Sequence, residues 1–132
     1  MNTKAMFSSE TDEWSTPQEF FEKYNAMYGF ETDVCATAEN AKCSRYFDKR
    51  ADGLAQEWSG VCWMNPPYGR EIGKWVKKAA ESRALVCCLV PARTDTAWWH
   101  DYVIDKAQKV EFVRGRLKFG GRKTERHFRA RL

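Results

Sequence analysis

The 132-residue chain has a hydrophobic content of 43% and an aromatic content of 14%, which favours one folded domain with one core over extensive disorder. No apolar run approaches the ~20 residues of a membrane span, and no signal-peptide pattern opens the chain, so we expect no membrane association and a cytoplasmic location. The net charge of +4 is concentrated in residues 109–132, which hold nine basic and two acidic side chains. Such an end is typical of either a polyanion-binding surface or a solvated tail.

The cysteine pattern argues against a metal site. No pair has the C-x-x-C spacing, and His100 and His127 lie far from any cysteine pair, so we expect no metal. We interpret the five thiols as buried or reduced: Cys35, Cys43, Cys62, Cys87 and Cys88.

The first predicted helix follows a polar segment, residues 1–13, that we expect to be flexible. The sequence Thr16–Glu19 is typical of a helix start, with Thr16 as the N-cap and Pro17 at the first helical position. Gly29 is expected to end this helix. Its apolar stripe consists of Phe20, Phe21, Tyr24 and Met27.

Hydrophobic periodicity then predicts alternating strands and helices. Short strands are expected at Phe30–Cys35, Val61–Met64 and Leu85–Val90, whereas residues 41–60 carry no clear signal. The helix expected between the last two strands has the apolar stripe Ile72, Trp75, Val76, Ala79 and Ala80. This order predicts an α/β fold with a mostly parallel sheet and right-handed crossovers.

The rest of the chain predicts one more helix and two short strands. Trp98, Trp99, Tyr102 and Val103 form the apolar side of the helix, and the strands are expected at Val110–Val113 and Leu117–Phe119.

The segment Asn65–Gly69, with the sequence Asn-Pro-Pro-Tyr-Gly, says most about chemistry. Two prolines forbid a helix or further sheet pairing, so a rigid polar loop is expected at the carboxyl end of a strand, where open α/β sheets bind ligands. The Asn65 amide oxygen and the Pro66 carbonyl could accept hydrogen bonds from an amino group on a flat base, while Tyr68 stacks on its ring. The alternative is an ordinary turn after a strand, since Asn-Pro and Pro-Tyr-Gly are common turn sequences.

Several collinear blocks resemble one family, the phage-encoded Dam-like DNA N6-adenine methyltransferases, which use S-adenosylmethionine. The resemblance covers residues 14 to about 121 and is carried by Trp14–Pro17, Asp33–Ala36, Glu39–Cys43, Asp52–Gln56, Asn65–Gly69, Pro91–Thr96 and Arg114–Phe119. It implies a Rossmann-like S-adenosylmethionine-dependent methyltransferase fold and methyl transfer to the N6 of adenine in DNA.

The resemblance also implies roles for individual residues. Asn65, Pro66 and Tyr68 would bind and polarise the adenine as the catalytic group. The cofactor-binding residues would be Thr16 and Pro17, near the methionine end, together with Asp33, Cys35, Ala36 and Asp52.

The chain departs from the family pattern in two places. The loop that starts at Asp33 has no glycine, whereas many relatives of this class use a Gly-rich loop there. Residues 122–132 form an atypical basic tail where family members have a last apolar strand. We therefore expect a methyltransferase domain at residues 14–121 and a sheet that lacks its last strand.

Together these patterns predict a site-specific adenine methyltransferase acting on double-stranded DNA with S-adenosylmethionine as cofactor. Two alternatives remain open at this point. One is an inactive DNA-binding remnant of such an enzyme, and the other is a methyltransferase that acts on RNA or on a protein glutamine.

Overall fold

A computed structural model describes residues 16–114, 118–119, 122–123 and 127–131, so the expected flexible segment 1–13 lies outside the described residues. The elements follow in the order α1 (Gln18–Tyr28), β1 (Thr32–Asp33), β2 (Arg45–Tyr46), η1 (Gly53–Ala55), β3 (Val61–Met64), α2 (Ile72–Glu81), β4 (Leu85–Pro91), η2 (Trp99–Ile104), β5 (Lys109–Phe112), β6 (Lys118–Phe119), β7 (Arg122–Lys123) and β8 (His127–Arg131).

The main sheet has the strand order β2-β1-β3-β4-β8-β5. The first four of these strands run parallel, which confirms the predicted parallel sheet. Helix α2 connects β3 to β4, and the pairing of Val61 with Leu85 sets their register. The arrangement is a Rossmann-like methyltransferase fold, in which parallel strands and crossover helices bring the carboxyl ends of β1, β2 and β3 to one edge.

The expectation of a missing last strand is wrong. Strand β8 lies between β4 and β5 and runs antiparallel to both. Its sequence, His-Phe-Arg-Ala-Arg, alternates polar and apolar residues rather than forming an apolar run. Backbone pairing on both sides places it in the sheet, because main-chain donors and acceptors pair whatever the charge of the side chains.

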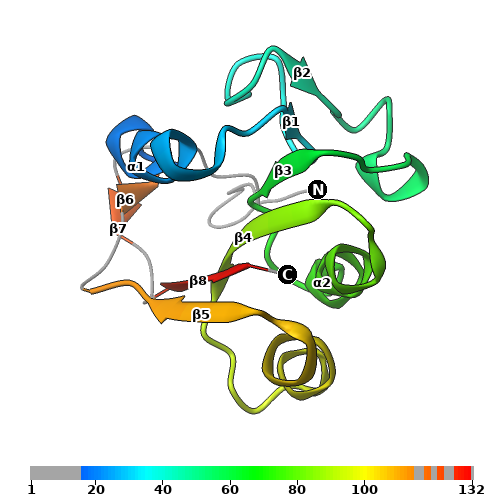
Figure 1. Cartoon of the computed structure of the whole chain (residues 1–132), viewed down its shortest axis with the longest axis vertical. Coiled ribbons are helices and arrows are strands. Elements are labelled where there is room, and N and C mark those ends of the chain that lie inside the picture. Colours follow the sequence, from blue (N-terminus) through cyan, green and yellow to red (C-terminus); the bar gives the residue numbers. More distant parts are fainter. Residues whose placement is uncertain (1–15, 115–117, 120–121, 124–126, 132) are drawn as a thin grey trace.

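Helices cover both faces of the sheet (Figure 1). Against one face, Phe21 of α1 packs with Trp63, Cys87 and Leu89. Against the other face, α2 and η2 bury a larger cluster that includes Ile72, Trp75, Val76, Trp99 and Val103. Successive residues of β3 and β4 therefore point to opposite sides, as strand geometry requires.

Helix α2 begins at Ile72, and its buried residues, Ile72, Trp75, Val76 and Ala79, belong to the predicted stripe. Helix α1 ends at Gly29, as expected, in the left-handed conformation. Its start differs from the prediction: Pro17 is the N-cap, and no side chain caps the helix. The hydroxyl of Thr16 instead bonds to Asn65, as described below.

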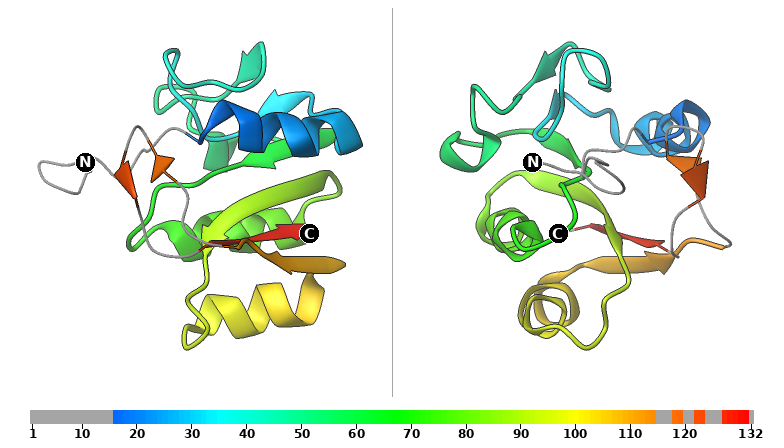
Figure 2. Two further views of the ribbon diagram at one scale, coloured as in Figure 1. Left: turned by 90° about the vertical axis from the view of Figure 1, so that its left-hand side faces the viewer. Right: turned by 180° about the vertical axis from the view of Figure 1, so that it is seen from behind.

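Strands β2 and β7 were not anticipated, whereas β6 lies within the strand expected at Leu117–Phe119. Strand β2 is only two residues long and lies within residues 41–60, where the sequence has no periodicity to reveal it. Strands β6 and β7 pair with each other in a separate two-stranded sheet, set apart from the main one (Figure 2). Among the described residues, no helix combines the length and apolar character needed to cross a bilayer.

Candidate active site at the carboxyl edge of the sheet

A cavity of about 230 Å³ opens where β1, β2 and β3 end. Three segments that are distant in sequence form its wall: Thr16 before α1, the loops that follow β1 and β2, and the region between β3 and α2. Its lining residues are Thr16, Asp33, Cys35, Ala36, Asn40, Lys42, Phe47, Asp48, Lys49, Asp52, Gly53, Leu54, Trp63, Asn65, Pro67, Glu71 and Trp75.

Asp33, at the end of β1, holds the loop that follows it. The residue is 3% exposed, and its carboxylate accepts hydrogen bonds from the backbone N–H groups of Cys35 at 3.2 Å and Lys42 at 3.0 Å. Burial raises the pKa of Asp33 to about 6, although these two N–H groups and the Lys42 charge oppose the shift. The carboxylate thus holds both ends of the loop 34–42 in place.

Backbone hydrogen bonds complete the support of this loop. Val34 N–H donates to the Trp63 carbonyl at 3.1 Å, and Ala36 N–H donates to the Phe47 carbonyl at 3.0 Å. Phe47 N–H donates in turn to the Asp33 carbonyl. The strand-end loops of β1, β2 and β3 are therefore joined into one surface.

Gly53 explains how a glycine-free loop can sit tightly in this fold. A Cβ at position 53 would overlap the carbonyl oxygen of Val34 and would lie 2.9 Å from Cη2 of Trp75. Related loops use a glycine of their own for close packing. Here the glycine belongs to η1 instead, and it lets η1 approach the main chain of the loop after β1. Beside it, Asp52 adopts a left-handed conformation with φ of 59°, which is uncommon for a residue with a side chain.

The loop after β3 is tied to the start of α1. The Asn65 side chain donates from Nδ2 to Oγ1 of Thr16 at 2.8 Å, across 49 residues of sequence. Pro66 is buried and Tyr68 is partly buried, and Tyr68 packs against the cluster under α2. Gly69, with φ of 122°, then turns the chain into α2, a conformation that residues with a Cβ rarely adopt.

The cavity brings together six of the nine residues expected at the site: Thr16, Asp33, Cys35, Ala36, Asp52 and Asn65. Pro17, Pro66 and Tyr68 are not part of its lining. Pro66 and Tyr68 continue the Asn65 loop toward α2, and Pro67 between them does line the cavity.

Several lining residues were not predicted. Phe47, Asp48 and Lys49 directly follow β2, which the sequence did not reveal, and Trp75 belongs to α2, where its spacing predicted only a core position. A signal was present for the acids: in dinucleotide-binding sheets an acidic residue about 20 positions after the first loop binds ribose. Asp48, like the predicted Asp52, lies near that spacing from Asp33.

The donor set suits an organic ligand with a flat ring, hydroxyls and positive charge. Four carboxylates and two ammonium groups line the cavity, and the aromatic rings of Phe47, Trp63 and Trp75 offer apolar surface beside them. The described residues contain no group of three or more His, Cys, Asp or Glu side chains arranged to hold a metal ion.

The fold is that of a Rossmann-like methyltransferase, and the Asn-Pro-Pro-Tyr loop lies at the edge where open α/β sheets bind ligands. Comparison with known proteins agrees: residues 3–130 match the family DNA N-6-adenine-methyltransferase (Dam). The chain belongs to this family, as the resemblance in its sequence indicated.

Two relatives give the range of similarity. The chain is 27% identical over 129 residues to the DNA N-6-adenine-methyltransferase of Haemophilus phage HP1 (strain HP1c1), covering 93% of this chain and 73% of that protein. It is 35% identical over 65 residues to the Escherichia coli (strain K12) protein YfdM, named as a putative methyltransferase, covering 43% of this chain and 71% of that protein.

Proposed function

We propose that this chain is a site-specific methyltransferase that moves a methyl group from S-adenosylmethionine to the N6 of adenine in double-stranded DNA. The observation that carries the proposal is the hydrogen bond between Asn65 and Thr16. It joins the loop suited to an amino-bearing base to the cavity suited to the cofactor, so that the acceptor and the methyl donor would meet at Asn65.

The acceptor would be held by the Asn65 loop. The Asn65 amide oxygen and the Pro66 carbonyl accept hydrogen bonds from the adenine amino group, which draws N6 toward tetrahedral geometry and makes its lone pair available. These bonds strengthen as N6 becomes positively charged in the transition state. The extra proton leaves to water afterwards, so the chain needs no general base.

Tyr68 would stack on the flipped adenine. Its packing against the core cluster under α2 supports this role, because a ring that is held on one side makes a fixed platform on the other. The prolines at positions 66 and 67 restrict the loop in the same way. Because the loop is already rigid, little conformational entropy is lost when adenine binds. The loop can therefore hold N6 in line with the methyl group of the cofactor.

The cavity residues fit the cofactor by the chemistry of their donors. S-adenosylmethionine, when bound, supplies a methyl group on a positively charged sulfur. Asp33 fixes the loop of Cys35 and Ala36 as one wall. Asp52, an exposed residue of the lining, would accept hydrogen bonds from hydroxyl groups of the cofactor. The excess of carboxylates over ammonium groups favours a cationic ligand.

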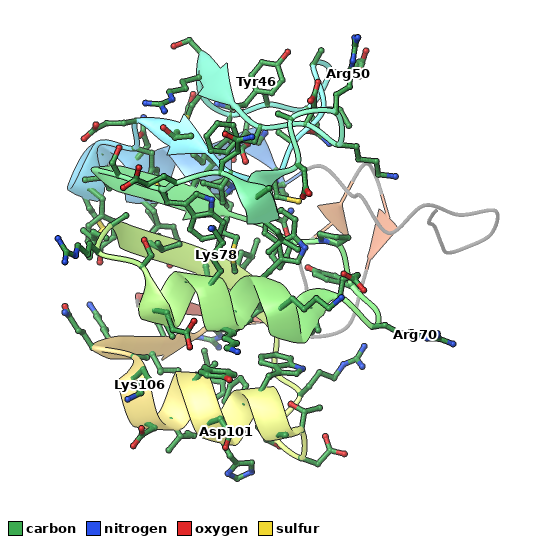
Figure 3. All side chains as sticks on the ribbon, turned by 90° about the vertical axis from the view of Figure 1, so that its right-hand side faces the viewer. Tyr46, Arg50, Arg70, Lys78, Asp101 and Lys106 are labelled. Carbon is green, nitrogen blue, oxygen red and sulfur yellow. The ribbon has the colours of Figure 1, made fainter. Side chains whose placement is uncertain are left out.

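Exposed basic residues border the same edge of the molecule. Lys49 lines the cavity, and Arg50 and Arg70 project outward from the loops that follow β2 and β3 (Figure 3). Positive side chains around the mouth would contact DNA phosphates and position the duplex over the cavity.

The test is methyl transfer to unmethylated double-stranded DNA from isotope-labelled S-adenosylmethionine, with mass spectrometry of the released nucleosides. Labelled N6-methyldeoxyadenosine is the expected product. Parallel reactions with RNA and with protein identify the acceptor, and label found only there would overturn the proposal.

Variants connect the product to the loop. Asn65→Ala should lower the rate by about 100-fold or more, the usual effect of losing a polarising group. Tyr68→Ala should cost about 10- to 100-fold, whereas Tyr68→Phe keeps the stacking ring and most of the activity. Asn25→Ala is the matched control, because the oxygen of that side chain accepts from Phe30 N–H at 2.8 Å in the turn after α1, and Asn25 is not part of the cavity lining.

A further inference from the structure

We infer that Thr16 is a positioning residue that sets the orientation of the Asn65 amide, an inference that rests on the proposed function. Thr16 occupies the sequence position of a helix cap, yet α1 has no side-chain cap. The residue is 4% exposed, and its hydroxyl is directed to the Asn65 side chain instead. The hydroxyl therefore serves a tertiary contact rather than the start of the helix.

The two ends of an amide are chemically opposite. Rotation of the Asn65 side chain by half a turn would exchange its oxygen and nitrogen with almost no change in shape. In that state the site would present an N–H₂ donor to the adenine amino group, which is itself a donor. Only the orientation with oxygen toward the base can polarise N6.

In this structure Thr16 Oγ1 accepts from Nδ2 of Asn65 at 2.8 Å, so the hydroxyl acts as the acceptor that the productive orientation requires. With the nitrogen committed to Thr16, the amide oxygen is turned away from that hydroxyl, because the two polar atoms leave the same carbon in different directions. The hydroxyl is held in place by burial against the start of α1, where Phe21 N–H donates to the Pro17 carbonyl.

Kinetic measurements can distinguish a hydroxyl that orients the Asn65 amide from one that binds the cofactor. A hydroxyl that orients the amide affects the rate of the chemical step, whereas a hydroxyl that contacts the cofactor affects cofactor affinity. Thr16→Val removes the acceptor with little change of shape, and Thr16→Ser retains it. We expect Thr16→Val to lower kcat by about 10-fold, the rate equivalent of one ordinary hydrogen bond, and Thr16→Ser to restore most of that loss.

Thr96→Val is the matched control. The Thr96 hydroxyl also makes hydrogen bonds at the start of a helical segment, to the Arg93 carbonyl at 2.7 Å and from Trp99 N–H at 3.3 Å. It does not line the cavity. Its loss should leave kcat and the Asn65 amide unchanged.

The experiment combines steady-state kinetics, calorimetry with S-adenosylmethionine and NMR of the full chain. The Asn65 side-chain N–H₂ signal, assigned by its absence in Asn65→Ala, should move toward the value of a solvated amide in Thr16→Val but not in Thr16→Ser. An unchanged signal and unchanged kcat in Thr16→Val would overturn the inference. Weaker cofactor binding with normal kcat would also overturn it, by showing that the hydroxyl serves the cofactor.

Failure of the proposed function can be distinguished from failure of this inference by the activity of the wild-type chain. In that case the wild-type chain itself transfers no methyl group to DNA, and the kinetic part of the inference fails with it. The NMR signal does not depend on activity, so it alone then decides whether Thr16 holds the Asn65 amide.

Discussion

Replacing Gly53 with alanine tests the close packing between η1 and the loop after β1. The added methyl would overlap the Val34 carbonyl oxygen and would lie 2.9 Å and 3.1 Å from two carbons of the Trp75 ring. Neither neighbour moves easily: one is main chain that is also hydrogen-bonded to Trp63 through its N–H group, and the other is a 7% exposed indole in the core. The loop and η1 must therefore separate.

The size of the effect follows from two opposing terms. Forcing an extra methyl into a packed site costs ~1–3 kcal/mol, whereas alanine restricts the unfolded chain and returns about 0.4–1 kcal/mol. We expect a net destabilisation of about 1–2 kcal/mol. Because Trp75 and Gly53 both line the cavity, S-adenosylmethionine should also bind more weakly.

Gly73→Ala is a control of opposite sign. Position 73 lies inside α2, and a Cβ there would meet Trp98 at 3.5 Å, an ordinary contact. Since alanine exceeds glycine in helix propensity by ~0.8–1 kcal/mol, this variant should be more stable than the wild type. Urea unfolding followed by circular dichroism, together with calorimetric cofactor titration, measures both effects. A Gly53→Ala protein with the wild-type unfolding midpoint and wild-type cofactor affinity would refute the packing argument.

Three further variants test other parts of the structure. Burial raises the pKa of Asp33 from 3.8 to about 6 in the folded chain, so its stabilising contribution is present below pH 3.8 and is lost as the pH rises through 6. That loss amounts to about 3 kcal/mol. Asp33→Asn should therefore flatten the pH dependence of urea unfolding between pH 4 and 7. Equal slopes in the two proteins would contradict the raised pKa of Asp33. Ala130→Pro should destabilise by about 1–3 kcal/mol in the same assay, because proline removes a ladder donor and residue 130 pairs with both Cys88 and Val110. A neutral result would remove β8 from the sheet. Arg70→Ala should weaken binding to a DNA duplex and reduce the slope of log affinity against log salt by about 1, whereas Arg83→Ala, exposed just before β4 on the opposite edge, should do neither.

The sequence predicted those parts of the fold in which side-chain burial determines the element. Helix α2 and strands β3 and β4 bury apolar residues with the period of a helix or a strand, and the periodicity located them to within a residue or two. Strand β2 was missed, and β8 was expected to be absent. Main-chain pairing holds both strands in the sheet, and such pairing leaves no pattern of apolar side chains in the sequence. Arg45–Tyr46 is too short to show alternation, and the basic residues of β8 hid a strand whose partners are distant in sequence.

The residues of the candidate site likewise fall into those that the sequence predicted and those that only the tertiary structure reveals. Asn65 was predicted because it directly follows a recognisable strand, and Asp33 because the family resemblance implied a cofactor loop that starts there. Gly53 and Trp75 were not, since nothing local shows that a glycine in one loop makes room for the backbone of another. The helix start at Thr16 shows the reverse error: its sequence is a good capping signal, but a tertiary partner, Asn65, takes the hydroxyl.

The position of the site in the sheet indicates how it would fail. The cavity is built on β1 and β2, two-residue strands whose register consists of a few pairs, while β4, β8 and β5 form longer ladders on the other side. The short strands depend on bonds outside the ladders, including those made by the Asp33 carboxylate. Damage to the long ladders, as in Ala130→Pro, should therefore lower global stability with little change in the cofactor affinity of the molecules that remain folded. Damage at Gly53 or Asp33 should loosen the cavity first, because the strands with the fewest main-chain bonds open at the lowest free energy.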